Sequence, residues 1–210
     1  FNRDPQNTEL GKKIIQYSVI LINEIGLEAF NFKKLAERIE STEASIYRYF
    51  ENKHSLLLFL TSWYWEWVHY LIDVNTKNID DPKRKLKIAI QNIVQASEES
   101  SLTDYVNENL LHRIIVNEGS KAYHTHSVDA QNKNGLFLSY KELVEKVASI
   151  INEVNPDFKY KNSLASNLFE MSNNQRYFAE HLPRLTDIQS DNSKELLEMM
   201  EYFVLKLLKK

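Results

Sequence analysis

Cysteine is missing from this chain of 210 residues, and residues that interrupt helices are scarce. Without thiols there can be no disulfides, no thiolate zinc sites and no cysteine nucleophile. Only four glycines and four prolines occur, too few for the many turns of a β-sandwich or barrel. Hydrophobic residues make up 43% of the chain, which is typical of a globular protein. We therefore expect an all-α protein with a buried core.

Long apolar runs and enzyme motifs are also missing. No run approaches the ~20 apolar residues that cross a bilayer, and residues 1–9 are polar with no signal-peptide core. We expect a soluble, cytoplasmic protein with no membrane partner. The sequence has no Gly-rich phosphate loop, nucleophile elbow or H-E-x-x-H motif. These absences argue against an enzyme, and we expect no cofactor.

The N-terminal region lacks an excess of positive charge. Residues 1–55 contain eight basic and eight acidic residues: Arg3, Lys12, Lys13, Lys33, Lys34, Arg38, Arg48 and Lys53 against Asp4, Glu9, Glu24, Glu28, Glu37, Glu40, Glu43 and Glu51. Neutralisation of phosphates supplies most non-specific affinity for DNA. A neutral region therefore predicts weak non-specific binding unless its cations gather on one face.

Two short apolar faces follow one another within residues 32–57. The first consists of Leu35, Ala36 and Ile39, and the second of Ile46 and Phe50. This spacing predicts two short helices that share one small core, as in a helix-turn-helix. Thr42 is placed to cap the second helix, and the small or polar residues after it would point outward, where they can approach base edges.

The end of this segment reads I-Y-R-Y-F-E-N-K-H-S-L-L. It resembles the signature of TetR-type bacterial transcriptional regulators, in which Tyr-x-Tyr-Phe closes the recognition helix and an Asn/Ser-Lys pair opens the next helix. The resemblance extends upstream through residues 26–30 and covers roughly residues 8–60. In that family a Gly and an apolar residue usually stand where this chain has Glu40 and Ser41, and Lys is common at the position of Glu43.

The resemblance implies that the second short helix reads double-stranded operator DNA. Ser45 and Arg48 would contact bases or phosphates, and Tyr47 a phosphate or a thymine methyl group. Lys33, Thr42 and Lys53 would hold the DNA backbone by their positions. The alternative is a helical hairpin with no role in DNA binding.

Helix starts and stops can be placed along the rest of the chain. We expect Asn7 or Thr8, Asn31 and Asn52 to cap helices, and Gly26 to end the first one with a positive φ. Further helices are expected at residues 52–74, 82–96, 101–116, 136–152, 162–182 and 196–208, with a loop or short helix within 119–135. This pattern predicts a helix-turn-helix domain at residues 1–52, joined by a long helix to a bundle for ligand binding and dimerisation at 53–210.

The long helix carries many aromatic residues that could line a ligand site. Trp63 and Trp67 lie one turn apart, and we expect Tyr105 and His112 opposite them, around a small apolar effector. Plain core packing is the competing interpretation, since a helix between two bundles must bury large side chains. His124 and His126 alternate like metal ligands, but they lack the third and fourth ligands of a metal site. We expect no metal.

Apolar stripes on the helices at 136–152 and 162–182 predict a homodimer, with Leu143 and Phe178 in its interface. Together these observations favour a DNA-binding transcriptional regulator, implied by the resemblance to be a repressor relieved by a ligand. The alternative is a helical protein-interaction module that does not bind DNA.

Overall fold

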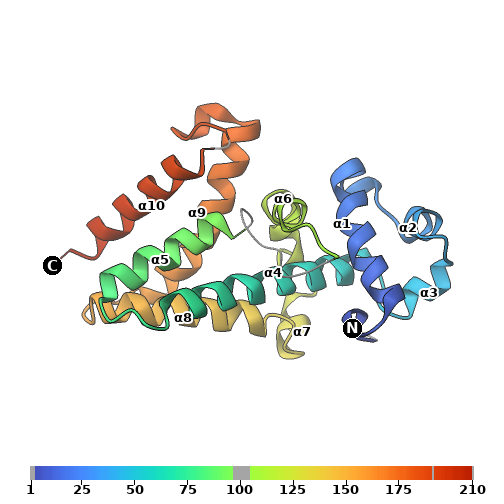
Figure 1. Cartoon of the computed structure of the whole chain (residues 1–210), viewed down its shortest axis with the longest axis horizontal. Coiled ribbons are helices and arrows are strands. Elements are labelled where there is room, and N and C mark those ends of the chain that lie inside the picture. Colours follow the sequence, from blue (N-terminus) through green and yellow to red (C-terminus); the bar gives the residue numbers. More distant parts are fainter. Residues whose placement is uncertain (1–2, 97–104, 191, 210) are drawn as a thin grey trace. The chain divides into compact units, whose positions relative to one another are not determined.

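The computed structural model describes residues 3–96, 105–190 and 192–209, and these residues form helices and no strand. The helices are η1 (Pro5–Asn7), α1 (Glu9–Ala29), α2 (Phe32–Arg38), α3 (Glu43–Tyr47), α4 (Lys53–Thr76), α5 (Pro82–Gln95), α6 (Glu108–Glu118), η2 (Gly119–Ala122), α7 (Val128–Lys133), α8 (Leu138–Val154), α9 (Lys161–His181), η3 (Pro183–Leu185) and α10 (Ser193–Leu207) (Figure 1). The expected all-α fold class is confirmed.

The chain divides into two compact units. One comprises residues 1–64 and 97–136, and the other residues 65–96 and 137–210. The first half of α4 thus belongs to the first unit and its second half to the second. The domain boundary expected at residue 52 stays a prediction; in these units α6 packs against α1 and is grouped with the N-terminal helices.

The first unit is built on α1, α2 and α3. Phe30, Leu35, Ile46 and Phe50 are at most 1% exposed and form the small core that the apolar spacing predicted. α6 packs against α1. The amide of Asn23 on α1 donates to the carbonyl of Leu110 at 2.9 Å, which holds the first turn of α6. The three-helix N-terminal region is therefore supported by a segment from much later in the chain.

The second unit is a helical bundle. α8 packs mainly against α9 and α5, and α10 packs against α5 and α9 (Figure 1). Its core is apolar and includes Ile72, Leu86, Ile90, Val94, Leu143, Val147, Ile151, Leu168, Met200 and Val204.

Most helix boundaries follow the local signals. Thr8, Asn31, Thr42, Asn52 and Asp81 each accept a backbone N–H in the first turn of a helix. Gly26 has a φ of 75°, as expected at the end of the first long helical run, and the chain bends there. One start is wrong: α6 begins at Glu108, capped by Asn107, and not at Ser101, which lies outside the described residues.

The turn between α2 and α3 contains a non-glycine residue with a left-handed backbone. The N–H of Ser41 donates to the Ala36 carbonyl at 2.9 Å and that of Glu40 to the Glu37 carbonyl at 3.4 Å. This pair of bonds is a Schellman ending, which requires a positive φ at Glu40, and its φ is 53°. Glycine adopts this conformation without the steric conflict that a Cβ introduces.

We predict that Glu40→Gly stabilises the protein by roughly 0.5–1 kcal/mol, because relief of the backbone conflict outweighs the extra freedom of glycine in the unfolded chain. Chemical denaturation would measure the change. Glu40→Gln is the matched control, since it removes the charge and keeps the Cβ. If the glutamine variant gains as much stability as the glycine variant, the cause is charge and not backbone conformation.

Candidate functional site

The short helix α3 presents a polar surface to solvent. Its inner side is anchored by Ile46, which is fully buried, and by Phe50 just after the helix. Tyr47 is 48% exposed and Arg48 is also exposed. The expected division between core and outward residues is therefore confirmed.

Two hydroxyl groups stabilise the start of α3. The Thr42 hydroxyl oxygen accepts the backbone N–H of Ser45 at 3.3 Å, and the two side-chain hydroxyls lie 2.9 Å apart. Both side chains stay at the surface, and Glu43 and Ala44 beside them are exposed. The chain thus presents a row of small or short polar groups at the end of the helix where base edges would approach.

Tyr47 is braced by α2. Its ring meets the ring of Phe32 edge to face, with centroids 5.1 Å apart. Phe32 is buried, so it forms a fixed support. The exposed part of Tyr47 is consequently held in one direction, which suits a contact with a phosphate or a thymine methyl group.

Several cations of the first unit are already engaged within the protein. The ammonium of Lys53 donates to the carbonyls of Leu27 and Glu28 at 2.9 and 3.1 Å. Lys34 donates to the Ala29 carbonyl at 2.8 Å, and Arg38 pairs with Glu24. These cations contact the C-terminal part of α1 and bind it to the helices that follow.

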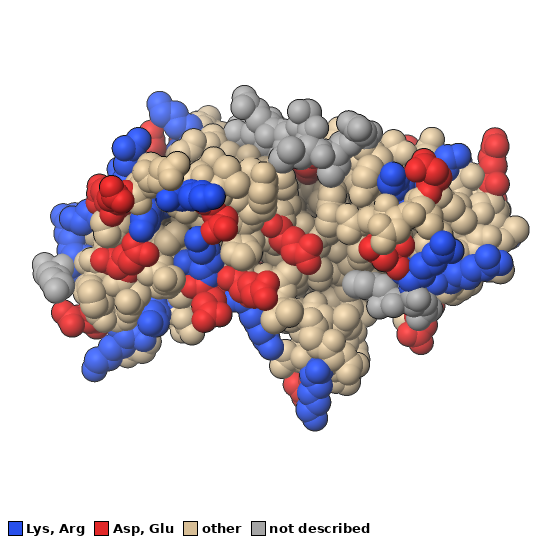
Figure 2. Space-filling model, turned by 60° about the horizontal axis from the view of Figure 1, so that its bottom comes forward, with Lys and Arg blue, Asp and Glu red and all other residues tan. Residues whose placement is uncertain are grey.

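Lys33 and Arg48 differ from those cations. Both side chains are exposed, and no ion pair or hydrogen bond joins either of them to another described residue. They are the cations of the helix-turn-helix most available to an external anion. Figure 2 shows Lys and Arg interspersed with Asp and Glu over the face it displays, with no continuous basic surface. Local placement, and not net charge, distinguishes these two residues.

The expected aromatic cluster is arranged as ring pairs. In the first unit Trp63 stacks on Tyr105 with centroids 6.5 Å apart, and His112 stacks on Tyr64 at 5.6 Å. Trp67 belongs to the second unit, where its indole N–H donates to the Ala96 carbonyl at 3.1 Å. Tyr105 therefore faces Trp63 as expected, whereas His112 faces Tyr64.

The rings of these pairs differ in their exposure to solvent. Burial raises the pKa of the Tyr105 hydroxyl, an effect that Lys12 opposes and Asp4 reinforces. His112 is buried at 6% exposure. Trp63 and Tyr105 are partly exposed, so they can be reached from solvent.

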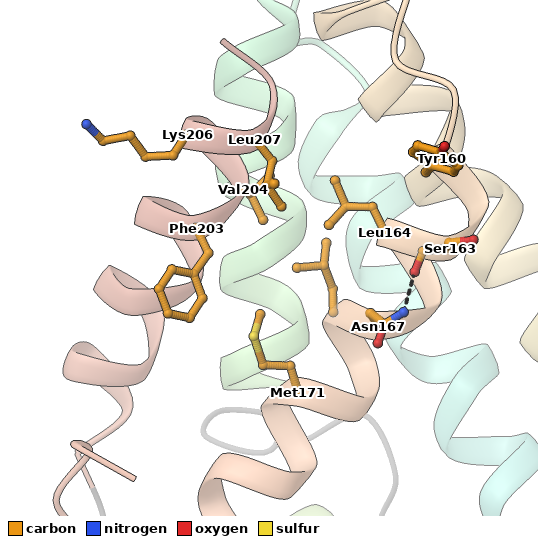
Figure 3. A pocket seen from close by; sticks show the side chains of 10 residues that line it. Tyr160, Ser163, Leu164, Asn167, Met171, Phe203, Val204, Lys206 and Leu207 are labelled. Carbon is orange, nitrogen blue, oxygen red and sulfur yellow. Dashed lines mark hydrogen bonds between the residues drawn. The ribbon is translucent and has the colours of Figure 1, made fainter.

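The second unit has an open apolar groove of about 550 Å³ between α9 and α10 (Figure 3). It is lined by Tyr160, Ser163, Leu164, Asn167, Leu168, Met171, Phe203, Val204, Lys206 and Leu207. Figure 3 shows Leu164 and Met171 facing Phe203 and Val204 across it, while the Lys206 ammonium points away. The amide of Asn167 is turned to the Ser163 carbonyl at 2.8 Å, which leaves the lining apolar.

Exposed apolar side chains occur on α10, at the two ends of α9 and in η3. Large apolar or aromatic residues that are exposed here are Tyr160, Leu182, Leu185, Tyr202, Phe203 and Leu207. The apolar stripes in the sequence pointed to residues 136–152 and 162–182, so they included α9 but missed α10, although the pair Tyr202-Phe203 beside the stripe of α10 was a usable signal. Leu143 is fully buried within the bundle, so its expected place in a dimer interface is wrong.

No group of three His, Asp or Glu side chains among the described residues is placed to hold a metal ion, and His124 and His126 are both exposed. Among the helices described, none is both long and apolar enough to span a bilayer.

Part of the sequence matches a known protein family. Residues 14–59 match the family described as bacterial regulatory proteins, tetR family. This segment contains the α2-turn-α3 unit and the start of α4, so the resemblance carried by the Tyr-x-Tyr-Phe motif is confirmed. No curated protein sequence matches the chain.

Solved structures share the fold over nearly the whole chain. A putative TetR-family transcriptional regulator from Syntrophomonas wolfei has a TM-score of 0.65 at 17% identity, covering 94% of this chain and 93% of its own. AibR in complex with isovaleryl coenzyme A and operator DNA has a TM-score of 0.61 at 12% identity, covering 91% and 97%. The superantigen PfiT has a TM-score of 0.62 at 14% identity, covering 97% of each chain. At these identities the likeness shows the fold alone.

Proposed function

We propose that this protein is a cytoplasmic transcriptional repressor that binds operator DNA through α3 and is released by a small ligand, because residues 14–59 match the tetR family of bacterial regulatory proteins. The observation that carries the proposal is the pair of outward side chains, Tyr47 and Arg48, on a short helix whose other side is locked in a core. Such a helix can enter the major groove while its support stays outside.

The proposed contacts fall into two groups. Arg48 and Ser45 read base edges, and Tyr47 contacts a phosphate or a thymine methyl group. Lys33, Thr42 and Lys53 lie at the starts of α2, α3 and α4, where they hold the phosphate backbone. Lys53 has two of its three ammonium hydrogens engaged with carbonyls, so one remains for a phosphate. Lys33 has no such internal role and is the stronger candidate.

We predict different consequences for three alanine variants, measured on an operator selected from random DNA. Arg48→Ala reduces the free energy of operator binding by on the order of 1–3 kcal/mol and relaxes the base preference at one base pair. Lys33→Ala weakens binding to all DNA sequences alike, and it lowers the slope of log affinity against log salt concentration by about one. Lys53→Ala additionally lowers the melting temperature, because the carbonyls of Leu27 and Glu28 lose their donor.

Lys194→Ala is the matched control, since Lys194 is exposed on α10 and makes only an ion pair with Glu198 within its own helix. It should leave affinity unchanged. If Arg48→Ala keeps full base preference and only lowers the salt slope, Arg48 is a phosphate contact and not a reader of bases.

A ligand-binding role is supported by the aromatic pairs of the first unit. AibR, which shares the fold, was crystallised with both a thioester of coenzyme A and operator DNA. In this chain we propose that a largely apolar ligand enters beside Trp63 and displaces Tyr105, with His112 of the same unit as a further contact. Tyr105 precedes α6, and α6 is held to α1 through Asn23. Displacing Tyr105 would therefore disturb the support of the helix-turn-helix.

We predict that small apolar acids and their coenzyme A thioesters, starting with isovaleryl coenzyme A, include a compound that quenches tryptophan fluorescence and weakens operator binding. The coupling must be reciprocal, so operator DNA weakens ligand affinity by the same factor. Trp63→Phe should abolish most of the quenching, whereas Trp65→Phe should not, because Trp65 is buried against Tyr140 in the other unit. A compound that quenches Trp63 without changing operator affinity would show a pocket with no switch.

A homodimer is the proposed assembly, and the groove between α9 and α10 is its proposed interface. Contiguous apolar surface of this kind is rare on monomers and common at subunit contacts. A two-fold dimer also supplies the two reading helices that paired half-sites require. The proposed interface keeps α9, which the sequence also predicted there. It contains α10 in place of α8, because Leu143 and Val147 of α8 are fully buried within the bundle.

We predict that the protein has twice its chain mass of 24.7 kDa by light scattering, and that Phe203→Glu shifts it to a monomer. Phe203 is 45% exposed at the groove, so the new charge would be buried only in a dimer. Leu138→Glu is the control, at a residue that is 57% exposed on α8 and outside the groove. A dimer that survives Phe203→Glu but dissociates with Leu138→Glu would place the interface elsewhere.

A protein-interaction module without DNA binding is the second candidate. The same fold serves a superantigen, and Glu40 and Glu43 lie exposed on the proposed reading surface. Retention on heparin and a mobility shift with random DNA at low salt separate the two candidates. The absence of both would favour the interaction module.

A further inference from the structure

Residues 3–8, which we call the N-terminal brace, precede the first long helix and contain hydrogen bonds of their own. The Asp4 carboxylate accepts the backbone N–H of Gln6 at 2.9 Å and the side-chain amide of Asn7 at 2.8 Å. Pro5 opens the short turn η1 and is buried. These hydrogen bonds lie within the brace itself and involve no other helix.

The brace packs closely against α1. A Cβ atom at Gly11 would lie 2.0 Å from the carbonyl oxygen of Pro5, a distance that no side chain tolerates. Gly11 is therefore required by the close approach of two backbones and not by an unusual φ. Thr8 then caps α1 by accepting the N–H of Gly11 at 3.0 Å.

Thr8 has a second partner far along the chain. Its hydroxyl lies 2.7 Å from the hydroxyl of Tyr49, 41 residues away, in a partly buried hydrogen bond. Tyr49 is 2% exposed, and the guanidinium of Arg3 lies over its ring at 5.6 Å from the centroid. The brace therefore contacts both the ring and the hydroxyl of Tyr49.

Tyr49 directly follows Arg48, which is the C-cap residue of α3. Its backbone N–H donates to the Ile46 carbonyl at 2.9 Å, so its position is coupled to α3. A five-residue helix has too few internal hydrogen bonds to set its own direction. Contacts with neighbouring elements must do so: Ile46 anchors the middle of the helix in the core, Thr42 caps its start, and Tyr49 is bonded to Thr8 beyond its end.

We propose that Thr8 is a positioning residue for operator recognition: its hydroxyl bond to Tyr49 fixes the angle at which α3 presents Arg48. This inference rests on the proposed DNA-binding function, and it adds a dependence of sequence-specific binding on residues before the first helix. Non-specific binding, which needs phosphate contacts but no register on the bases, does not require that angle.

Tyr49→Phe is the decisive variant, because it removes one hydroxyl and keeps the ring, the Arg3 contact and the cap of α1. We expect affinity for the selected operator to fall about five-fold, while affinity for random DNA at low salt stays unchanged. Thr8→Ser keeps both hydroxyl bonds and should bind like the wild type. Thr8→Gly removes the bond with little loss of capping, and it should match Tyr49→Phe in the ratio of specific to non-specific affinity.

The double variant Thr8→Gly, Tyr49→Phe should lose no more specificity than either single variant, since both remove the same bond. Thermal unfolding is measured on each protein, and specificity is compared only between folded samples. Equal specificity in the wild type and Tyr49→Phe would overturn the inference, and so would a loss in Thr8→Ser. If the wild type itself binds no DNA, the proposed function fails, and that outcome is distinct from both.

Discussion

A helix of five residues cannot hold its conformation in water, because the cost of starting a helix exceeds what so few hydrogen bonds return. α3 exists only because its neighbours hold it: Thr42 caps its start, Ile46 enters the core beneath it, and Tyr49 is bonded to Thr8 beyond its end. The same arrangement leaves Arg48 directed outward. Stability and the proposed recognition of DNA therefore depend on one set of contacts around a short element.

Charge in the first unit is distributed to support the fold before it supports binding. Lys34, Arg38 and Lys53 each satisfy a carbonyl or a carboxylate of α1 or of the bend after it. Lys33 and Arg48 make no such contacts with the described residues. They therefore remain available to an external anion, although the region has equal numbers of acidic and basic residues. Electrostatic attraction to DNA would be weak overall, so specific binding would rely on geometry to an unusual degree.

The fold by itself does not decide what the protein binds. Proteins that share it include one crystallised with operator DNA and a coenzyme A thioester and another described as a superantigen. The N-terminal match to the tetR family narrows the choice, because the shared segment is the helix-turn-helix itself. The ligand site and the dimer rest on features of this chain: the ring pair of Trp63 and Tyr105, and the apolar groove of α9 and α10.

Sequence alone determined the features that depend on a few neighbouring residues. Caps at Asn31, Thr42 and Asn52 and the bend at Gly26 are local, since each involves a bond or a φ within four residues of the signal. Tertiary structure decided what depends on distant partners. α8 and α10 are both amphipathic, and only packing shows that Leu143 is enclosed while Phe203 is exposed. Likewise Lys53 reaches Leu27, His112 meets Tyr64, and Thr8 binds Tyr49, because the fold brings together residues that no spacing in the sequence relates.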